Sequence, residues 1–138
     1  NSSTEPYIVA PNILVAHSAA VRLYRRKYKS TQHGLVGLNL FAYRPLPYTN
    51  SMADIVAVQR VYEFYLGWFA NPLMFGDYPD IMKRNVGSTF PKLTREESAQ
   101  VKGAIDFIAS NHYQTVQSGT TWLMEHLKLY VRLMTNAF

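Results

Sequence analysis

The acidic residues are the first candidates for chemistry, because two facing carboxyl groups can serve as acid and nucleophile. Glu96 and Glu97 are adjacent at a predicted helix start, where their side chains point about 100° apart and are expected to cap the helix. Asp77 and Asp80 lie in a turn-rich stretch and are expected to shape turns. Asp106 lies in a strand pattern and could be ion-paired. No pair of carboxylates is therefore predicted to act in catalysis.

The remaining chemistry-bearing residues predict neither a metal nor a cofactor. The chain has no cysteine, which excludes thiolate zinc sites and cysteine catalysis. Metal-ligand spacing is absent among the histidines, which are His17, His33, His112 and His126. His17 lies on an apolar helical face and is expected to be a hydrogen-bonded core residue. Ser118-Gly119 lacks partners for serine catalysis, no glycine-rich phosphate loop occurs, and Trp68 and Trp122 are expected in the core.

Length and composition favour one folded domain. The chain has 138 residues, 48% hydrophobic and 17% charged, which argues against disorder. Its formal charge is +5, and five cations gather near the end of a helical pattern, where the helix dipole favours them. We interpret them as a solvated helix end rather than a phosphate-binding patch; they are Arg22, Arg25, Arg26, Lys27 and Lys29. Without a nucleic-acid motif or an apolar run of about 20 residues, neither a nucleic-acid nor a membrane partner is predicted.

Hydrophobic periodicity predicts alternating helices and strands. The strand patterns are the apolar runs 35–41, followed by Pro45 and Pro47, and 105–109. The predicted helices are 13–28 with Gly34 as left-handed cap, 51–69 ending at Asn71-Pro72, 80–85, 94–103 and 120–134, with 73–79 as a packed loop. Helical crossovers imply parallel strands. Because two parallel strands make a poor independent sheet, the sequence reads as a slice of a larger α/β fold.

Four sequence blocks resemble plant family 1 glycoside hydrolases, the β-glucosidases. They are NSSTEPYIVA at 1–10, GWFANPL and FGDYP within 67–79, FPKLTREES at 90–98, and IDFI with NHY within 105–113. The resemblance is strong over 1–115, whereas 116–138 diverges. It implies that 1–138 is a single segment of a (β/α)8 barrel, a partial barrel of about two strands with crossover helices.

The resemblance also implies site residues. Members cleave β-glycosides with retention by two glutamates, one in a Thr-x-Asn-Glu-Pro motif and one in an Ile-Thr-Glu-Asn-Gly motif. Both motifs are expected to be missing here: Thr4-Glu5-Pro6 mimics the first, but its flanks match a later segment. No catalytic residue is therefore predicted. Asn111 and Tyr113 are the candidate substrate-binding residues, at the C-terminal end of a strand, because their family counterparts line the glucose pocket and hydrogen-bond the nucleophile. Plain packing or exposure is the alternative for both.

These observations predict a β-glucosidase-family fragment whose ancestral activity is hydrolysis of plant β-glucosides. The alternatives are a non-catalytic carbohydrate-binding or protein-interaction protein derived from the barrel, or a nonfunctional remnant. Expected partners are a weakly bound β-glucoside and, because two sheet edges would be bare, a second copy or a complementary chain. The family suggests a secreted, vacuolar or other plant compartment.

The purified 138-residue chain is expected to show no β-glucosidase turnover, because neither glutamate motif is present to supply nucleophile and acid. Release of the chromophore from an aryl β-glucoside measures this activity. Turnover by mass-verified protein that disappears in Glu5→Gln or Glu97→Gln would contradict the expectation.

Overall fold

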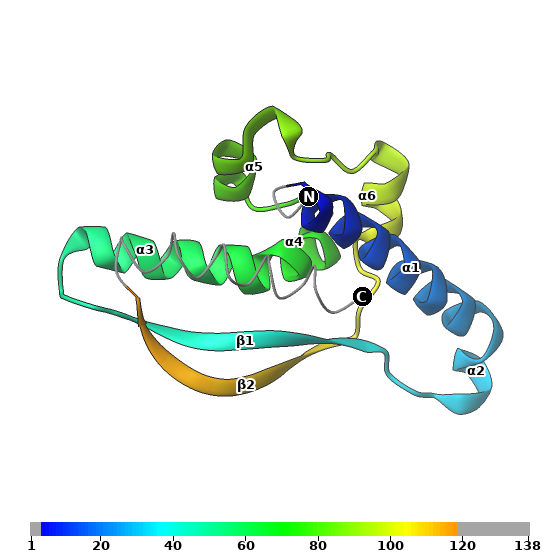
Figure 1. Cartoon of the computed structure of the whole chain (residues 1–138). Helices are drawn as coiled ribbons and strands as arrows, with labels where there is room; N and C mark the ends of the chain where they lie inside the picture. Colours follow the sequence, from blue (N-terminus) through cyan, green and yellow to red (C-terminus); the bar gives the residue numbers. More distant parts are fainter. Residues whose placement is uncertain (1–3, 119–138) are drawn as a thin grey trace.

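The computed structural model describes residues 4–118. In Figure 1 the helices other than α2 lie above a pair of long strands, and α1 runs beside α6. The elements in chain order are α1 (Glu5–Lys27), α2 (Lys29–Gln32), β1 (Gly37–Pro47), α3 (Met52–Tyr62), the π-helical turn η1 (Glu63–Gly67), α4 (Trp68–Phe75), α5 (Asp80–Val86), the 3-10 turn η2 (Gly87–Thr89), α6 (Arg95–Val101) and β2 (Phe107–Ser118).

β1 and β2 pair in parallel, as the alternation of elements predicted. The register joins Gly37 to Phe107 and Pro47 to Ser118. Both strands are longer than the predicted runs 35–41 and 105–109, and Pro45 and Pro47 lie inside β1 instead of following it. Each strand has an outer edge without a neighbour among the described residues, and such an edge tolerates the missing N–H of proline.

The end of the first helical region differs from the prediction. His33, not Gly34, takes the left-handed conformation, with φ of 53°. Gly34 has another role: its N–H donates to the Tyr24 hydroxyl at 2.8 Å, and a Cβ at position 34 would lie 2.6 Å from that oxygen. A larger residue at position 34 would displace the Tyr24 hydroxyl, so close approach to a side chain, rather than backbone conformation, favours glycine there.

The helix that follows β1 continues beyond its predicted end at Asn71-Pro72. α3, η1 and α4 follow one another without a break, and α4 ends only at Gly76, whose φ is 87°. Part of the predicted 73–79 loop is therefore helical. Pro72 and Leu73 are buried, so tertiary packing of the apolar face outweighs the local cost of proline.

The helices predicted to begin near residues 51 and 94 both start with a capping side chain. Thr94 and Glu97 form a reciprocal capping box, with Glu97 N donating to Thr94 Oγ1 at 3.1 Å and Thr94 N donating to Glu97 Oε2 at 2.8 Å. Ser51 caps α3 in one direction only, by accepting from Asp54 N. The Asp54 carboxylate instead accepts from the backbone N–H and the hydroxyl of Thr49.

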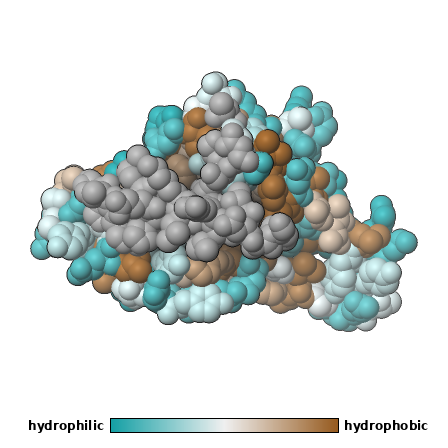
Figure 2. Space-filling view, in the orientation of Figure 1, coloured by the Kyte–Doolittle hydropathy of each residue, from teal (hydrophilic) through white to brown (hydrophobic). Residues whose placement is uncertain are grey.

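The main hydrophobic core lies among the helices. Leu14 and Val21 of α1 meet Trp68 and Leu73 of α4 and Met82 of α5, which confirms the core prediction for Trp68. Val36 and Leu38, at the start of β1, pack against this core. Apolar side chains also reach the surface in several patches on the face seen in Figure 2.

Thr94→Ala should lower the free energy of unfolding by about 1 kcal/mol, because the first turn of α6 loses its side-chain acceptor. Urea denaturation followed by circular dichroism measures the change. Thr94→Ser keeps the hydroxyl and serves as the matched control. An unchanged midpoint in Thr94→Ala would show that α6 does not depend on this cap.

Candidate functional site

The two candidate substrate-binding residues lie on β2 beside aromatic residues of β1. Asn111 pairs in register with Phe41, and Asn39 Nδ2 donates to Asn111 Oδ1 at 3.0 Å. Contrary to the prediction, Asn111 and Tyr113 lie in the middle of their strand, because β2 continues to pair with β1 as far as Ser118, with a shift of register between Ala42 and Arg44.

Aromatic rings form a continuous cluster around Phe41. Its ring centroid lies 4.7 Å from Tyr43, 5.6 Å from Tyr113 and 6.5 Å from Tyr65. Tyr65 comes from η1 and is only 6% exposed, whereas Tyr113 is 71% exposed. The cluster therefore runs from a buried base to an open ring. Exposed aromatic faces beside an amide suit stacking on a sugar ring while hydrogen-bonding its hydroxyls.

Two members of this arrangement were not predicted from the sequence. Asn39 lies two residues before Phe41, so the two-residue period of a strand puts both on one face, and that signal was sufficient to find it. The sequence places Tyr65 only within the predicted helix 51–69. Its contact with β1 depends on how η1 packs, which no local pattern reveals.

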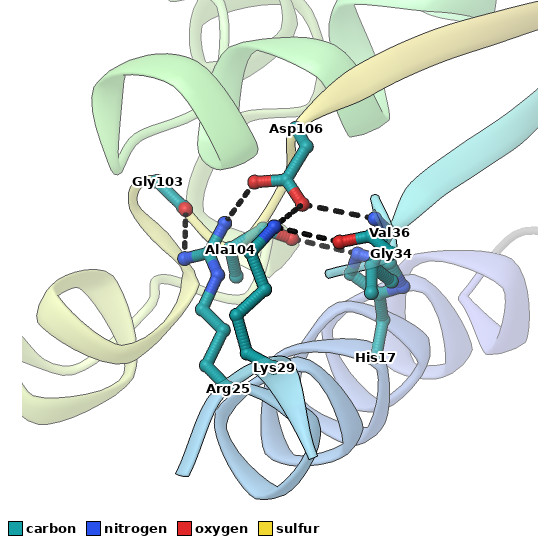
Figure 3. Close-up of polar contacts among 8 residues, drawn as sticks. All are labelled: His17, Arg25, Lys29, Gly34, Val36, Gly103, Ala104 and Asp106. Atoms are coloured by element: carbon teal, nitrogen blue, oxygen red, sulfur yellow. Dashed lines mark hydrogen bonds and ion pairs between the residues drawn. The ribbon is translucent and has the colours of Figure 1, made fainter. Parts of the chain in front are cut away.

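The opposite end of the strand pair is held by the Asp106 carboxylate, shown in Figure 3. Oδ1 accepts from Arg25 Nη2 at 2.7 Å, Oδ2 accepts from Val36 N at 2.9 Å, and Lys29 Nζ lies 3.8 Å from Oδ2. Two hydrogen bonds lower the pKa of Asp106 below its ordinary value. The larger effect comes from the N–H of Val36 and the next from Arg25. The expected ion pair is confirmed. We call this group of four residues the Asp106 clamp.

Three of the five clustered cations are therefore more than a solvated helix end, since Arg22 Nη2 also donates to the Ala99 carbonyl at 3.4 Å. Arg25 also donates to the Gly103 carbonyl at 2.8 Å, and Lys29 donates to the Gly34 carbonyl at 2.6 Å. The physical reason is that carbonyls and a carboxylate from the α6–β2 connection and the α2–β1 loop meet the end of α1. His17 contacts the same α6–β2 connection, with its Nε2 atom 2.8 Å from the Ala104 carbonyl oxygen. The predicted hydrogen bond of His17 is therefore present.

The other acidic candidates have structural partners. Lys83 Nζ lies 2.8 Å from a carboxylate oxygen of Asp77 and 2.8 Å from one of Asp80, and its hydrogen bond lowers the pKa of Asp80. Glu97 caps α6, and Glu5 lies in the first turn of α1. Within 4–118, no cluster of three or more histidine or acidic side chains is placed to hold a metal ion.

Some predictions concern other parts of the chain. The predicted helix 120–134, with Trp122 and His126, lies outside the described residues. Among the helices that are described, none combines the length and apolar character needed to cross a membrane.

A parallel strand pair joined by helices is the repeating unit of an α/β barrel, and the described residues have this arrangement. The model for glycosyl hydrolase family 1 matches residues 1–127. The chain belongs to this family, which confirms the predicted resemblance.

The curated relatives and solved structures are much longer than this chain. Beta-glucosidase 10 of Arabidopsis thaliana is 56% identical over 115 residues, covering 83% of this chain and 23% of that protein. A cyanidin 3-O-glucoside 7-O-glucosyltransferase (acyl-glucose) of Delphinium grandiflorum is 55% identical over 113 residues. The match covers 82% of this chain and 22% of that protein. The crystal structure of rice Os3BGlu6 β-glucosidase matches with a TM-score of 0.82 and 49% identity. The match covers 85% of this chain and 24% of the rice protein. The chain therefore spans about a quarter of the length of these proteins.

Asp106→Asn should destabilise the chain at neutral pH and much less in acid. The pKa of Asp106 is lowered in the folded state, so its stabilisation is present above the ordinary value of 3.8 and is lost as pH falls below it. Comparison of the thermal midpoints of wild type and variant from pH 7 to pH 2 measures this. Asp80→Asn, which removes a surface pairing with Lys83 alone, is the matched control. A difference between wild type and Asp106→Asn that stays constant with pH would contradict the role of the charge.

Proposed function

We propose that this chain supplies one wall of the glucoside-binding site of a retaining β-glucosidase that acts on plant β-glucosides. Family membership supports the reaction class. The observation that carries the site is the register of β1 and β2, in which Asn111 lies opposite Phe41 and beside Asn39. The named relatives are enzymes that process glycosides, which favours this function over a non-catalytic binding protein.

Asn111 is proposed to hydrogen-bond sugar hydroxyls. Asn39 donates to its Oδ1, which turns the Asn111 Nδ2 donor away from Asn39 and toward a ligand. A carboxamide with one anchored end loses less side-chain entropy when it binds, so its remaining hydrogen bonds are more favourable.

Tyr113 is proposed to hydrogen-bond the nucleophilic carboxylate through its hydroxyl. The Phe41 ring supports one side of Tyr113, with centroids 5.6 Å apart and planes inclined by 31°. The remainder of the side chain is open. A supported ring with an accessible hydroxyl is suited to orienting a carboxylate supplied by another strand of the barrel.

Glucosyl transfer is a second candidate reaction. The Delphinium glucosyltransferase is 55% identical to this chain, close to the 56% of an Arabidopsis β-glucosidase. A retaining enzyme forms a glucosyl-enzyme intermediate that water then hydrolyses, and an acceptor hydroxyl in place of that water gives transfer. Residues 4–118 are thus compatible with either acceptor.

The proposed partners of this segment are the other strands of the barrel, on a longer chain or on a complementary chain. β2 has exposed residues along most of its length and a neighbour on one edge only within 4–118. An unpaired edge is a template for another strand, and a closed barrel removes such edges. Association of copies through the same edges is the alternative partner arrangement.

A chimera tests the proposed site. Residues 4–118 would replace the matching segment of rice Os3BGlu6 β-glucosidase, and kcat/KM would be measured with an aryl β-glucoside. Asn111→Ala and Tyr113→Phe should each lower kcat/KM by roughly tenfold to hundredfold, since the first removes hydrogen bonds to sugar hydroxyls and the second removes one to the nucleophilic carboxylate. His112→Ala is the matched control, because alternate strand residues face opposite sides.

The chimera's far-UV circular dichroism establishes that it is folded. A folded, active chimera in which neither Asn111→Ala nor Tyr113→Phe changes kcat/KM would overturn the assigned site. A chimera that folds but is inactive would instead contradict the proposal that this segment forms part of a β-glucosidase active site.

A further inference from the structure

Positive charge gathers where the C-terminal ends of α1 and α6 meet and α2 begins. Six of the 12 lysine and arginine residues within 4–118 lie there, with only one of the eight acidic residues, Asp106. This region therefore carries a net charge of +5, and the other described residues carry −1. We call the six cations the basic patch; they are Arg22, Arg25, Arg26, Lys27, Lys29 and Lys102.

Helix dipoles account for only a small part of this charge. The C-terminal end of a helix carries about −0.5 of an elementary charge, so the ends of α1 and α6 together are balanced by about one cation. The Asp106 carboxylate is already counted in the net charge of +5. Most of the positive charge is therefore left without an internal counterpart, and like charges held close together repel one another. An anionic partner would relieve that repulsion.

Part of the basic patch is fixed by the fold. Arg22 and Arg25 donate to carbonyls at and just after the end of α6, at 3.4 and 2.8 Å. Arg25 and Lys29 also share the Asp106 carboxylate. These contacts hold the end of α1 against the end of α6, so the other cations of the patch project from a fixed base.

Three cations of the basic patch remain available to a partner. Arg26, Lys27 and Lys102 are exposed, and none has a side-chain hydrogen bond or ion pair with another residue within 4–118. Arg26 follows Arg22 by four residues, so the two guanidinium groups lie one after the other along the side of α1. A row of cations fits a chain of anionic groups better than it fits one small anion.

Two kinds of anionic partner fit this patch poorly. A helix that binds a lipid surface inserts a broad apolar face, whereas α1 buries its apolar face in the core, with Leu14 and Val21 0% exposed. Near the patch α1 leaves only Leu23 and Tyr28 as exposed large apolar side chains. Recognition of duplex DNA places a helix in the major groove, but α1 is packed along α6 and α4.

We propose that the basic patch binds an acidic polysaccharide, a chain of uronate sugars, whose carboxylates pair with Arg26, Lys27 and Lys102. A guanidinium group binds a carboxylate through two parallel hydrogen bonds. Tyr28, which is 46% exposed at the end of α1, adds an aromatic face for stacking on a sugar ring. Carboxylates recur along such a polymer as the arginines recur along α1.

The basic patch and the proposed glucoside site lie at different places along the strand pair. Asp106, directly before β2, contacts the patch, whereas Asn111 and Tyr113 lie further along that strand. Active sites of α/β barrels open at the carboxyl ends of the strands, away from the basic patch. A bound polysaccharide therefore leaves the glucoside site open, and its binding does not depend on the proposed function.

Fluorescence anisotropy with a labelled polygalacturonate tests the binding on the full 138-residue chain. Kd should rise by roughly tenfold between about 20 and about 200 mM NaCl, because salt screens charge pairs at the surface. The matched ligand is the fully methyl-esterified polymer, which keeps the sugar chain and removes its charges. It should bind more weakly by about tenfold or more.

Charge variants locate the binding surface. Arg26→Gln combined with Lys27→Gln removes two available cations and should raise Kd for polygalacturonate by about tenfold. Arg84→Gln combined with Lys92→Gln is the matched control, because it removes the same charge from another exposed part of the chain; Kd should change by less than about twofold. Lys102→Gln should raise Kd by about threefold and tests the patch without altering α1.

Three results would overturn the proposal. Equal loss of affinity in the two double variants would show that overall charge, rather than the basic patch, governs binding. Tighter binding of phosphatidylserine vesicles or duplex DNA than of polygalacturonate, at the same salt concentration, would assign the patch to that other partner. The third is absence of binding to polygalacturonate at about 20 mM NaCl by a chain that far-UV circular dichroism shows to be folded.

Discussion

The placement of the two strands depends on one carboxylate that three elements share. Asp106 receives hydrogen bonds from Arg25 of α1 and from the N–H of Val36, just before β1, while its own N–H donates to the Val36 carbonyl at 2.7 Å. These contacts fix where β2 starts relative to β1. A slip of one residue would turn every side chain of β2 to the other face, so the position of Asn111 beside Asn39 is set five residues earlier, at the Asp106 clamp.

Much of the fold could be predicted because the relevant signals are local. The Thr94–Glu97 capping box and the helix that ends near Gly87 need only neighbouring residues, and the predicted elements match the structure there. The errors occur where distant contacts decide the outcome. Burial of Pro72 carries a helix through its expected end, and the Tyr24 hydroxyl accounts for Gly34.

The candidate site shows the same division. The family resemblance predicts Asn111 and Tyr113 as site residues, and strand periodicity places Asn39 on the same face as Phe41. Tyr65 could not be identified in this way, because η1 inserts a wider turn between α3 and α4 and shifts the phase of the helical pattern. That turn directs Tyr65 at Tyr43, with ring centroids 5.7 Å apart. Aromatic contact between helix and strand thus depends on an irregularity that hydrophobic periodicity does not encode.

The division of stability and function along the chain has a physical consequence. The helices bury the core residues Leu14, Leu73 and Met82 almost completely, whereas Asn111 and Tyr113 lie on a strand that is exposed along most of its length. Ligand pockets gain affinity by enclosing most of a ligand's surface, and one open strand pair encloses little of it. The proposed site therefore needs other strands to close around it before it encloses a glucoside, however well packed the segment is. Stability of the segment and affinity for sugar are consequently separate properties, because the first depends mainly on the helical core and the second on the exposed strand pair.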